Sequence, residues 1–142
     1  MEQSGKEFRI MGIDYGEKRI GIALSDPLFT FAYPFNTLQN DESFLSCLSK
    51  IIVEKKIIKI ILGLPSSGFK SSGELAKKVI KLKAEIEKEN KIDVVLWDEE
   101  YSSVIAKEKI VESGYKKSKR RKKDLLDRHA AAVILQEFLD SK

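Results

Sequence analysis

The 142-residue sequence is poor in the residues that build cysteine- or histidine-based sites. Cys47 is the only cysteine and His129 the only histidine. An intrachain disulfide and a cysteine-based zinc site are therefore excluded, and a Cys-His nucleophilic pair has little support. No apolar run approaches the ~20 residues that a membrane-spanning helix needs. Residues 1–7 are polar and lack the apolar core of a signal peptide, so we expect a cytoplasmic protein with no membrane partner.

The positive charge of the chain is concentrated in one segment. Residues 116–123 carry seven positive charges, and since the net charge is only +4, the rest of the chain has a net charge of −3. A basic segment on a mildly acidic body suits a polyphosphate partner, although a solvated surface loop is the alternative. We predict that this basic segment binds nucleic acid through Lys116, Lys117, Lys119, Arg120, Arg121, Lys122 and Lys123.

The hydrophobic pattern predicts an α/β fold, with three strands followed by helices and strands in alternation. A hairpin sheet followed by crossover units gives a mixed β-sheet with helices packed on its faces. The length suits one domain over residues 1–142 with one core. The expected strands are 8–14, 19–26, 30–38, 57–64 and 92–97, and the expected helices are 41–54, 74–89, 102–113 and 124–139.

Two of these elements carry local signals. Pro34 cannot donate to a strand ladder, so residues 30–38 are expected to form an edge strand or to contain a bulge. The aromatic residues of this stretch are expected to pack inward, with a base-stacking surface as the alternative. Asp41 is the expected N-cap of the helix that follows.

Acidic residues stand at the ends of predicted elements. Asp14 ends the first strand, Asp98 and Glu99 end the fifth, and Asp127 is expected in the first turn of the last helix. Carboxylates crowded at one sheet edge repel each other unless cations hold them together. Such oxygen ligands suit Mg²⁺ or Mn²⁺, and two ions can clamp a phosphodiester for in-line displacement. His129 lies roughly 200° around the helix from Asp127, so we expect a packing or surface role for it.

Several segments together resemble one protein family. Residues 10–26, Gly63-Leu64-Pro65, residues 97–103 and residues 127–139 are similar, in the same order, to motifs of the YqgF (RuvX) family of pre-16S ribosomal RNA nucleases. This family belongs to the RNase H-like superfamily, which also includes the Holliday junction resolvases. The resemblance implies an RNase H-like fold and a metal-dependent nuclease that processes the 5′ end of pre-16S rRNA, with ribosomal precursor particles as partners.

Other functions remain open from the sequence. One is a Holliday junction resolvase that acts on branched DNA, and another is a non-catalytic RNA-binding assembly factor. A third is an ATPase of the actin and sugar-kinase type, because Asp14 and Gly16 also resemble the phosphate loop of that group. Length argues against the third, since those proteins need two such domains around a cleft.

The resemblance also implies roles for the carboxylates. Asp14, Glu99 and Asp127 match the family's acidic triad, as catalytic residues and as ligands of two Mg²⁺ or Mn²⁺ ions. Adjacent residues of a strand point to opposite faces, so only one of Asp98 and Glu99 should enter the site. Following the resemblance, we favour Glu99 as the ligand and Asp98 as a supporting residue. Asp124, three residues before Asp127, is either a helix N-cap or a fourth ligand.

The resemblance also covers a pair of cations, and it has departures at a few positions. Lys18 and Arg19 match the family's Lys-Arg pair, and Arg19 is expected to contact a phosphate or to brace a carboxylate, with a plain surface charge as the alternative. Glu100 stands where the family has an arginine. Ser66 and Ser67 replace the family's Leu-Asn, which removes the side-chain contacts those residues would supply.

Overall fold

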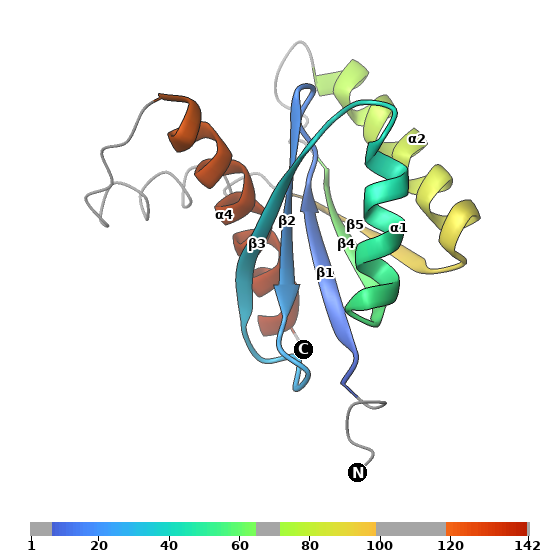
Figure 1. Ribbon diagram of the computed structural model, residues 1–142, viewed down its shortest axis with the longest axis vertical. Coiled ribbons are helices and arrows are strands. Elements are labelled where there is room, and N and C mark those ends of the chain that lie inside the picture. The colour runs from blue at the N-terminus through green and yellow to red at the C-terminus, as the bar shows by residue number, and fades with distance from the viewer. Residues whose placement is uncertain (1–6, 65–71, 99–118, 142) are drawn as a thin grey trace.

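The computed structural model describes residues 7–64, 72–98 and 119–141, and for residues 72 and 119–126 it describes the backbone only. Figure 1 shows the arrangement of the helices and strands. The predicted helix at 102–113 and the residues Ser66, Ser67, Glu99, Glu100, Lys116 and Lys117 lie outside the described residues. The elements are β1 (Arg9–Asp14), β2 (Arg19–Ser25), β3 (Ala32–Gln39), α1 (Phe44–Glu54), β4 (Ile57–Leu64), α2 (Ser72–Asn90), β5 (Asp93–Asp98) and α4 (Lys119–Asp140).

The five strands form one mixed sheet in the order β3-β2-β1-β4-β5. β1, β2 and β3 pair antiparallel, whereas β1, β4 and β5 run parallel. The carboxyl ends of the three parallel strands therefore meet at one edge of the sheet, together with the start of β2. Asp14 and Asp98 end two of these strands, so the topology collects the predicted acidic positions at that edge.

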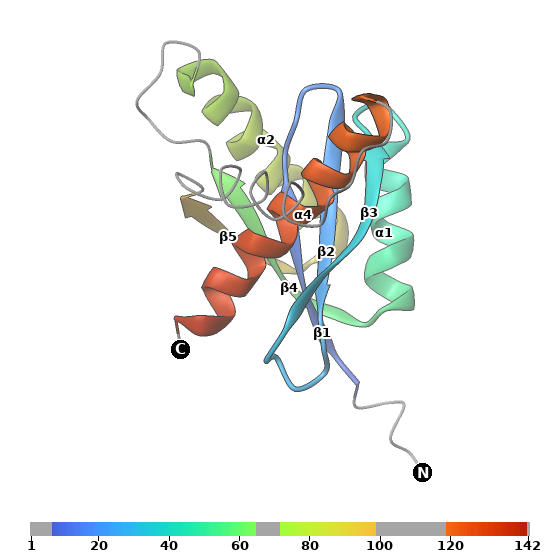
Figure 2. The same cartoon turned by 90° about the vertical axis from the view of Figure 1, so that its left-hand side faces the viewer.

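Helices cover both faces of the sheet. α1 and α2 lie on one face and α4 crosses the other, as Figures 1 and 2 show from two directions. The strand residues alternate between the two faces, since Met11 and Ile13 pack with α1 and α2, while Ile10 packs with α4. None of the described helices is long and apolar enough to cross a membrane.

The edge strand β3 confirms one expectation and corrects another. Pro34 lies on an edge strand and next to a register shift in the pairing of β2 with β3, so both expected features are present. Phe35 packs against the core, but Phe31 and Tyr33 are 67% and 40% exposed. The prediction that these aromatics pack inward is wrong for those two residues, because α1 packs on β4 and leaves this end of the edge strand uncovered.

Two helix starts also differ from the prediction. α1 begins at Phe44 with Ser43 at the N-cap position, and Asp41 instead accepts hydrogen bonds from the amide and hydroxyl of Ser43 at 2.9 and 2.6 Å. α4 begins at Lys119, because Lys and Arg are good helix formers and nothing in the basic segment stops the helix. Asp124 is therefore inside the helix and not its N-cap, and Asp127 lies in the third turn.

Candidate active site

Asp14 and Asp127 lie at neighbouring positions on the α4 face of the sheet edge. Asp14 is directly opposite Gly21 in the antiparallel pair of β1 and β2, where opposed Cα atoms are about 4.5–5.5 Å apart. The backbone of Asp127 rests on Gly21 so closely that a Cβ there would overlap its carbonyl oxygen. Alternate residues of β1 point to the same face of the sheet, and Ile10 and Gly12 face α4. The side chain of Asp14 therefore projects to the side of the sheet where Asp127 lies.

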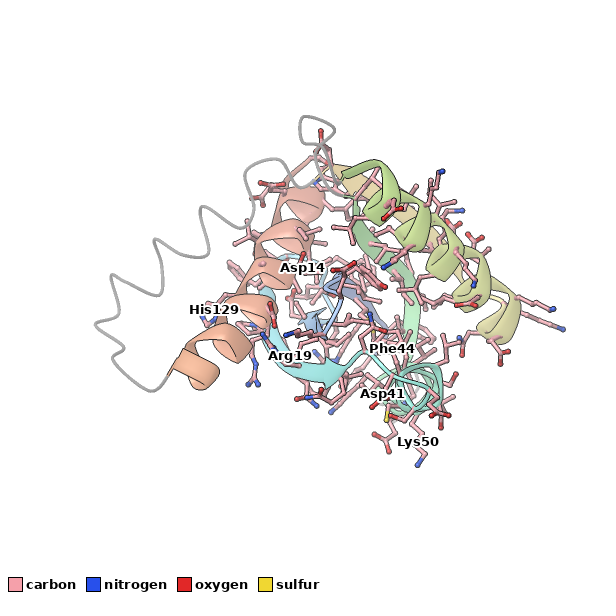
Figure 3. The ribbon with its side chains drawn as sticks, turned by 90° about the horizontal axis from the view of Figure 1, so that it is seen from above. Asp14, Arg19, Asp41, Phe44, Lys50 and His129 are labelled. Carbon is pink, nitrogen blue, oxygen red and sulfur yellow. The ribbon has the colours of Figure 1, made fainter. Side chains whose placement is uncertain are left out.

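Arg19 joins the start of β2 to Asp127. Its Nε lies 3.2 Å from Oδ2 of Asp127, and both side chains are 23% exposed. In Figure 3 Arg19 lies on the side of the sheet that α4 covers. A charge-assisted hydrogen bond of this kind fixes the carboxylate and balances part of its negative charge. The contact corresponds to the bracing role that the sequence offered as one alternative for Arg19.

The turn between β1 and β2 is held from two sides. The Asn40 side chain donates to the carbonyl of Gly16 at 2.8 Å, and the Asn40 amide donates to the carbonyl of Lys18 at 3.0 Å. Lys78 of α2 forms an exposed ion pair with Glu17 at 2.9 Å, and this hydrogen bond lowers the pKa of Glu17. Lys18 is exposed at the tip, next to the strand end that carries Asp14.

β5 presents Asp98 on the face opposite Asp14. Val94 and Leu96 pack in the cluster under α1 and α2, whereas Val95 and Trp97 pack with α4. Alternation places Asp98 with Val94 and Leu96, away from the face where Asp127 lies. The roles assigned to Asp98 and Glu99 stay predictions, and the described residues give only the face on which Asp98 lies.

Contacts from α4 to the sheet fix the orientation of this helix. Trp97 donates from Nε1 to Glu137 at 3.0 Å, and its ring meets that of Phe138 edge-on, with centroids 5.6 Å apart. Arg128 donates from Nε to the Thr37 hydroxyl at 3.1 Å. α4 is therefore anchored to β3 through Arg128, the residue after Asp127, and to β5 near its C-terminal end.

His129 lies on the side of α4 away from Asp14, as Figure 3 shows. It is half-buried. The position agrees with the expected packing or surface role.

Two of the three predicted metal ligands, Asp14 and Asp127, are among the residues that the structure describes. Within ranges 7–64, 72–98 and 127–141 there is no group of three or more His, Cys, Asp or Glu side chains that would hold a metal ion. Glu99 is outside the described residues, and for Asp124 only the backbone is described. Asp14 and Asp127 are the pair that the fold brings together.

Gly21 is a positioning residue that the sequence reasoning missed. The signal was present, because a glycine inside a strand often marks close approach of another backbone. Gly12 is a second such position, where a Cβ would lie 2.8 Å from the carbonyl oxygen of Ala131 and 2.8 Å from Cβ of Leu135. The two glycines let α4 lie directly on β1 and β2.

The sequence was also compared with models of known protein families. The family model for RuvX, described as Holliday junction resolvase, matches residues 8–141. The chain belongs to the RuvX family. Among curated relatives of this RuvX-family protein, "Putative pre-16S rRNA nuclease" of Desulforamulus reducens is 36% identical, over 94% of the chain and 97% of the relative. The protein of the same name from Syntrophomonas wolfei is 40% identical, over 93% and 94%.

Solved structures confirm the predicted RNase H-like fold of this RuvX-family protein. Thermus thermophilus RuvC in complex with a Holliday junction substrate has a TM-score of 0.57 and 16% identity, with 94% of each chain covered. Fowlpox virus resolvase in complex with Holliday junction DNA has a TM-score of 0.50 and 16% identity, with 94% and 97% covered. At these identities the likeness concerns the fold.

Proposed function

We propose that this RuvX-family protein is a divalent-metal-dependent nuclease that processes the 5′ end of pre-16S rRNA in the cytoplasm, with residues 1–142 as one nuclease domain. The observation that carries the proposal is the meeting of Asp14 and Asp127 at one sheet edge, with Arg19 bracing the second carboxylate. The names of the curated relatives agree with the nuclease predicted from the sequence.

The donor set fits Mg²⁺ or Mn²⁺. Asp14 and Asp127 offer carboxylate oxygens, which hard divalent cations prefer, and Glu99 is the third proposed ligand. When bound, such ions lower the pKa of an attacking water and stabilise charge on the phosphodiester oxygens. Alternation along β5 argues against Asp98 as the ligand, because Asp98 has the parity of Leu96, which packs on the face away from α4.

The chain's own residues hold this site in place. Asp14 stands at the end of a strand paired on both sides, which limits its backbone motion. Arg19 keeps the Asp127 carboxylate in one orientation and reduces its repulsion with Asp14. Asp124 is proposed as a fourth ligand, because it lies three residues before Asp127 on the same helix.

The basic segment is proposed to bind the nucleic-acid backbone. Residues 119–123 belong to α4, the same helix that carries Asp127, so phosphate contacts there would position the substrate relative to the acidic pair. Replacing Lys119, Arg120, Arg121 and Lys122 by alanine is expected to weaken affinity and to flatten its log–log salt dependence by ~0.7–0.9 for each lost contact. An unchanged slope would assign the segment to solvent.

A second candidate is cleavage of branched DNA. The family description favours it, because it names Holliday junction resolvase. Purified protein is incubated with a 5′-extended pre-16S rRNA fragment and with a four-way DNA junction, each with Mg²⁺ or Mn²⁺. We expect metal-dependent cleavage of the RNA. Cleavage of the junction alone would establish the second candidate, and tight RNA binding without any cleavage would indicate a non-catalytic assembly factor, which Glu100 in place of the family's arginine keeps open.

A further inference from the structure

An exposed aromatic surface lies at the end of the sheet opposite the acidic edge. It consists of Phe31, Tyr33 and Phe35, which are 67% exposed, 40% exposed and partly buried, respectively. Tyr33 pairs with Leu24, whose side chain is in the cluster under α1 and α2, so the ring of Tyr33 is on that face of the edge strand. In Figure 1 the connection between β2 and β3 lies at the bottom, away from the end of β1.

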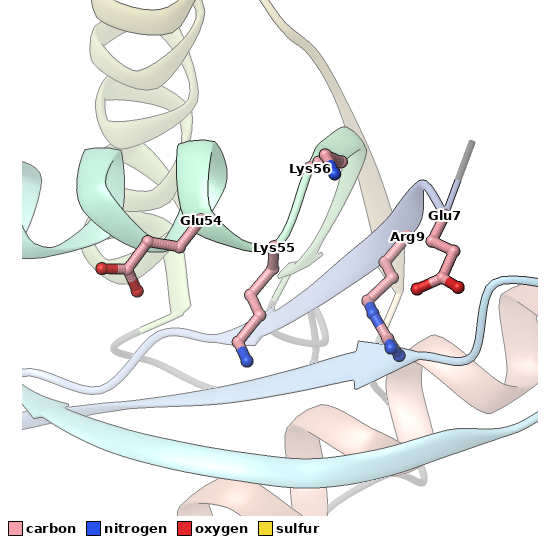
Figure 4. Close-up of a pocket in the computed structure, with 5 residues that line it drawn as sticks. All are labelled: Glu7, Arg9, Glu54, Lys55 and Lys56. Atoms are coloured by element: carbon pink, nitrogen blue, oxygen red, sulfur yellow. The ribbon is translucent and has the colours of Figure 1, made fainter. Parts of the chain in front are cut away.

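Cations stand beside two of these rings. Arg9 donates from Nη1 to the Tyr33 hydroxyl at 3.0 Å, and Nζ of Lys55 lies 5.5 Å from the centroid of the Phe35 ring. Arg9 and Lys55 also line a cavity of about 210 Å³, shown in Figure 4. Its other lining residues are Lys56, Glu7 and Glu54, so three cations face two carboxylates and the lining has an excess of positive charge.

The loop that presents Phe31 is held in one conformation. The Asp26 carboxylate accepts hydrogen bonds from the amides of Thr30 at 2.7 Å and Phe31 at 2.8 Å. The Gln136 side chain of α4 accepts from the Ala32 amide at 2.8 Å and donates to the Thr30 carbonyl at 3.0 Å. A ligand that stacks on Phe31 therefore meets a pre-organised backbone and pays little ordering entropy.

We propose that this surface binds a single-stranded segment of the RNA substrate away from the cleavage site, with bases stacked on Phe31 and Tyr33 and phosphates near Arg9 and Lys55. The inference rests on the proposed function for its choice of RNA. Interleaved rings and cations are typical of single-strand binding grooves, whereas lysine is depleted in protein–protein interfaces. An RNA that contacts both ends of the sheet spans roughly 25 Å, the length of an eight-residue strand such as β3.

Oligouridine binding tests the proposal directly. Fluorescence anisotropy with a short labelled oligouridine is measured in EDTA, which prevents metal-dependent cleavage. The double variant Phe31→Leu/Tyr33→Leu keeps apolar side chains but removes both π-faces, and we expect its Kd to rise about tenfold or more. Ile80→Ala, at a 52% exposed position of α2, is the matched control and is expected to bind as the wild type does. Thermal melts establish that each variant is folded.

Crosslinking and kinetics complete the test. With 4-thiouridine in the oligonucleotide, crosslinks at residues 31–35 are expected, and in hydrolysis the double variant is expected to raise KM more than it lowers kcat. Wild-type affinity in the double variant, or crosslinks confined to residues 116–123, would overturn the proposal. If the wild type cleaves no RNA, the proposed function fails, while the oligouridine result still decides whether this surface binds RNA.

Discussion

On one face of the sheet α4 lies directly on glycine positions, whereas on the other face α1 and α2 rest on large aliphatic side chains. A Cβ at Gly12 or Gly21 would meet the α4 backbone. The opposite face is filled by side chains such as Leu48, Ile60 and Ile86, all fully buried. The first arrangement fixes a helix backbone against strands and so fixes the position of Asp127. The second provides most of the apolar burial, so site geometry and stability reside largely on different faces.

The largest expected effect comes from the acidic edge itself. Asp14→Asn is nearly isosteric and is expected to retain the fold, with a Tm equal to or above that of the wild type because carboxylate repulsion is relieved. Hydrolysis is expected to fall by more than the about 10–100-fold that outer-shell partners of a metal contribute. Asp93→Asn, the same exchange at the start of β5, is the control. Wild-type cleavage by Asp14→Asn would refute the metal site.

The aliphatic face predicts the opposite pattern of loss. Leu48→Ala removes a fully buried side chain of α1 and is expected to lower the free energy of unfolding by ~2–5 kcal/mol. The hydrolysis rate per folded molecule is expected to stay near the wild-type value, as measured by urea unfolding and single-turnover cleavage. Val53→Ala, at a 76% exposed position of the same helix, serves as the control. If Leu48→Ala lowered metal affinity in proportion to its loss of stability, the contributions of the two faces to stability and to site geometry would not be separable.

The glycine contacts distinguish stability from site geometry on the α4 face. Gly21→Ala and Gly12→Ala both force α4 away from the sheet and are each expected to cost ~1–3 kcal/mol, typical of overpacking. Only Gly21→Ala acts at the backbone of Asp127, so only this variant is expected to weaken Mn²⁺ binding markedly. Calorimetric Mn²⁺ titration beside thermal melts makes the comparison, and equal Mn²⁺ affinities in the two variants would remove Gly21 from the site.

The exposed pair between Glu17 and Lys78 is expected to have the smallest effect. Its hydrogen bond lowers the pKa of Glu17, so its contribution to stability is present above the unfolded-state pKa of Glu17 and is lost as pH falls through the folded-state value. The Tm of Glu17→Gln is therefore expected to lie slightly below the wild-type Tm at neutral pH and to match it in acid. A Tm difference that persists below that pH would point to another cause.

Much of this fold follows from patterns within single segments. Residues 57–64 read as a buried central strand, and β4 has the same bounds. The position of Pro34 predicted the edge strand and the irregular pairing. These features were predictable because each depends on the chemistry of a short stretch of chain.

The remaining features depend on contacts between distant segments. The bond from Arg19 to Asp127 joins residues 108 positions apart, and the sequence offered it only as one alternative. The exposure of Phe31 and Tyr33 depends on where α1 packs, which aromatic content does not reveal. The early start of α4 escaped prediction because a run of like charges was read as a loop, although its residues favour helix.

The most direct test of the acidic site compares two adjacent carboxylates at the end of β5. Mn²⁺ binding to folded Glu99→Gln and Asp98→Asn is measured by calorimetry, with RNA cleavage followed in parallel. The account predicts that Glu99→Gln loses metal affinity and cleavage, as Asp127→Asn does, while Asp98→Asn keeps most of both. An active Glu99→Gln beside a folded, metal-free and inactive Asp98→Asn would contradict it and would place the ligand on the opposite face of β5.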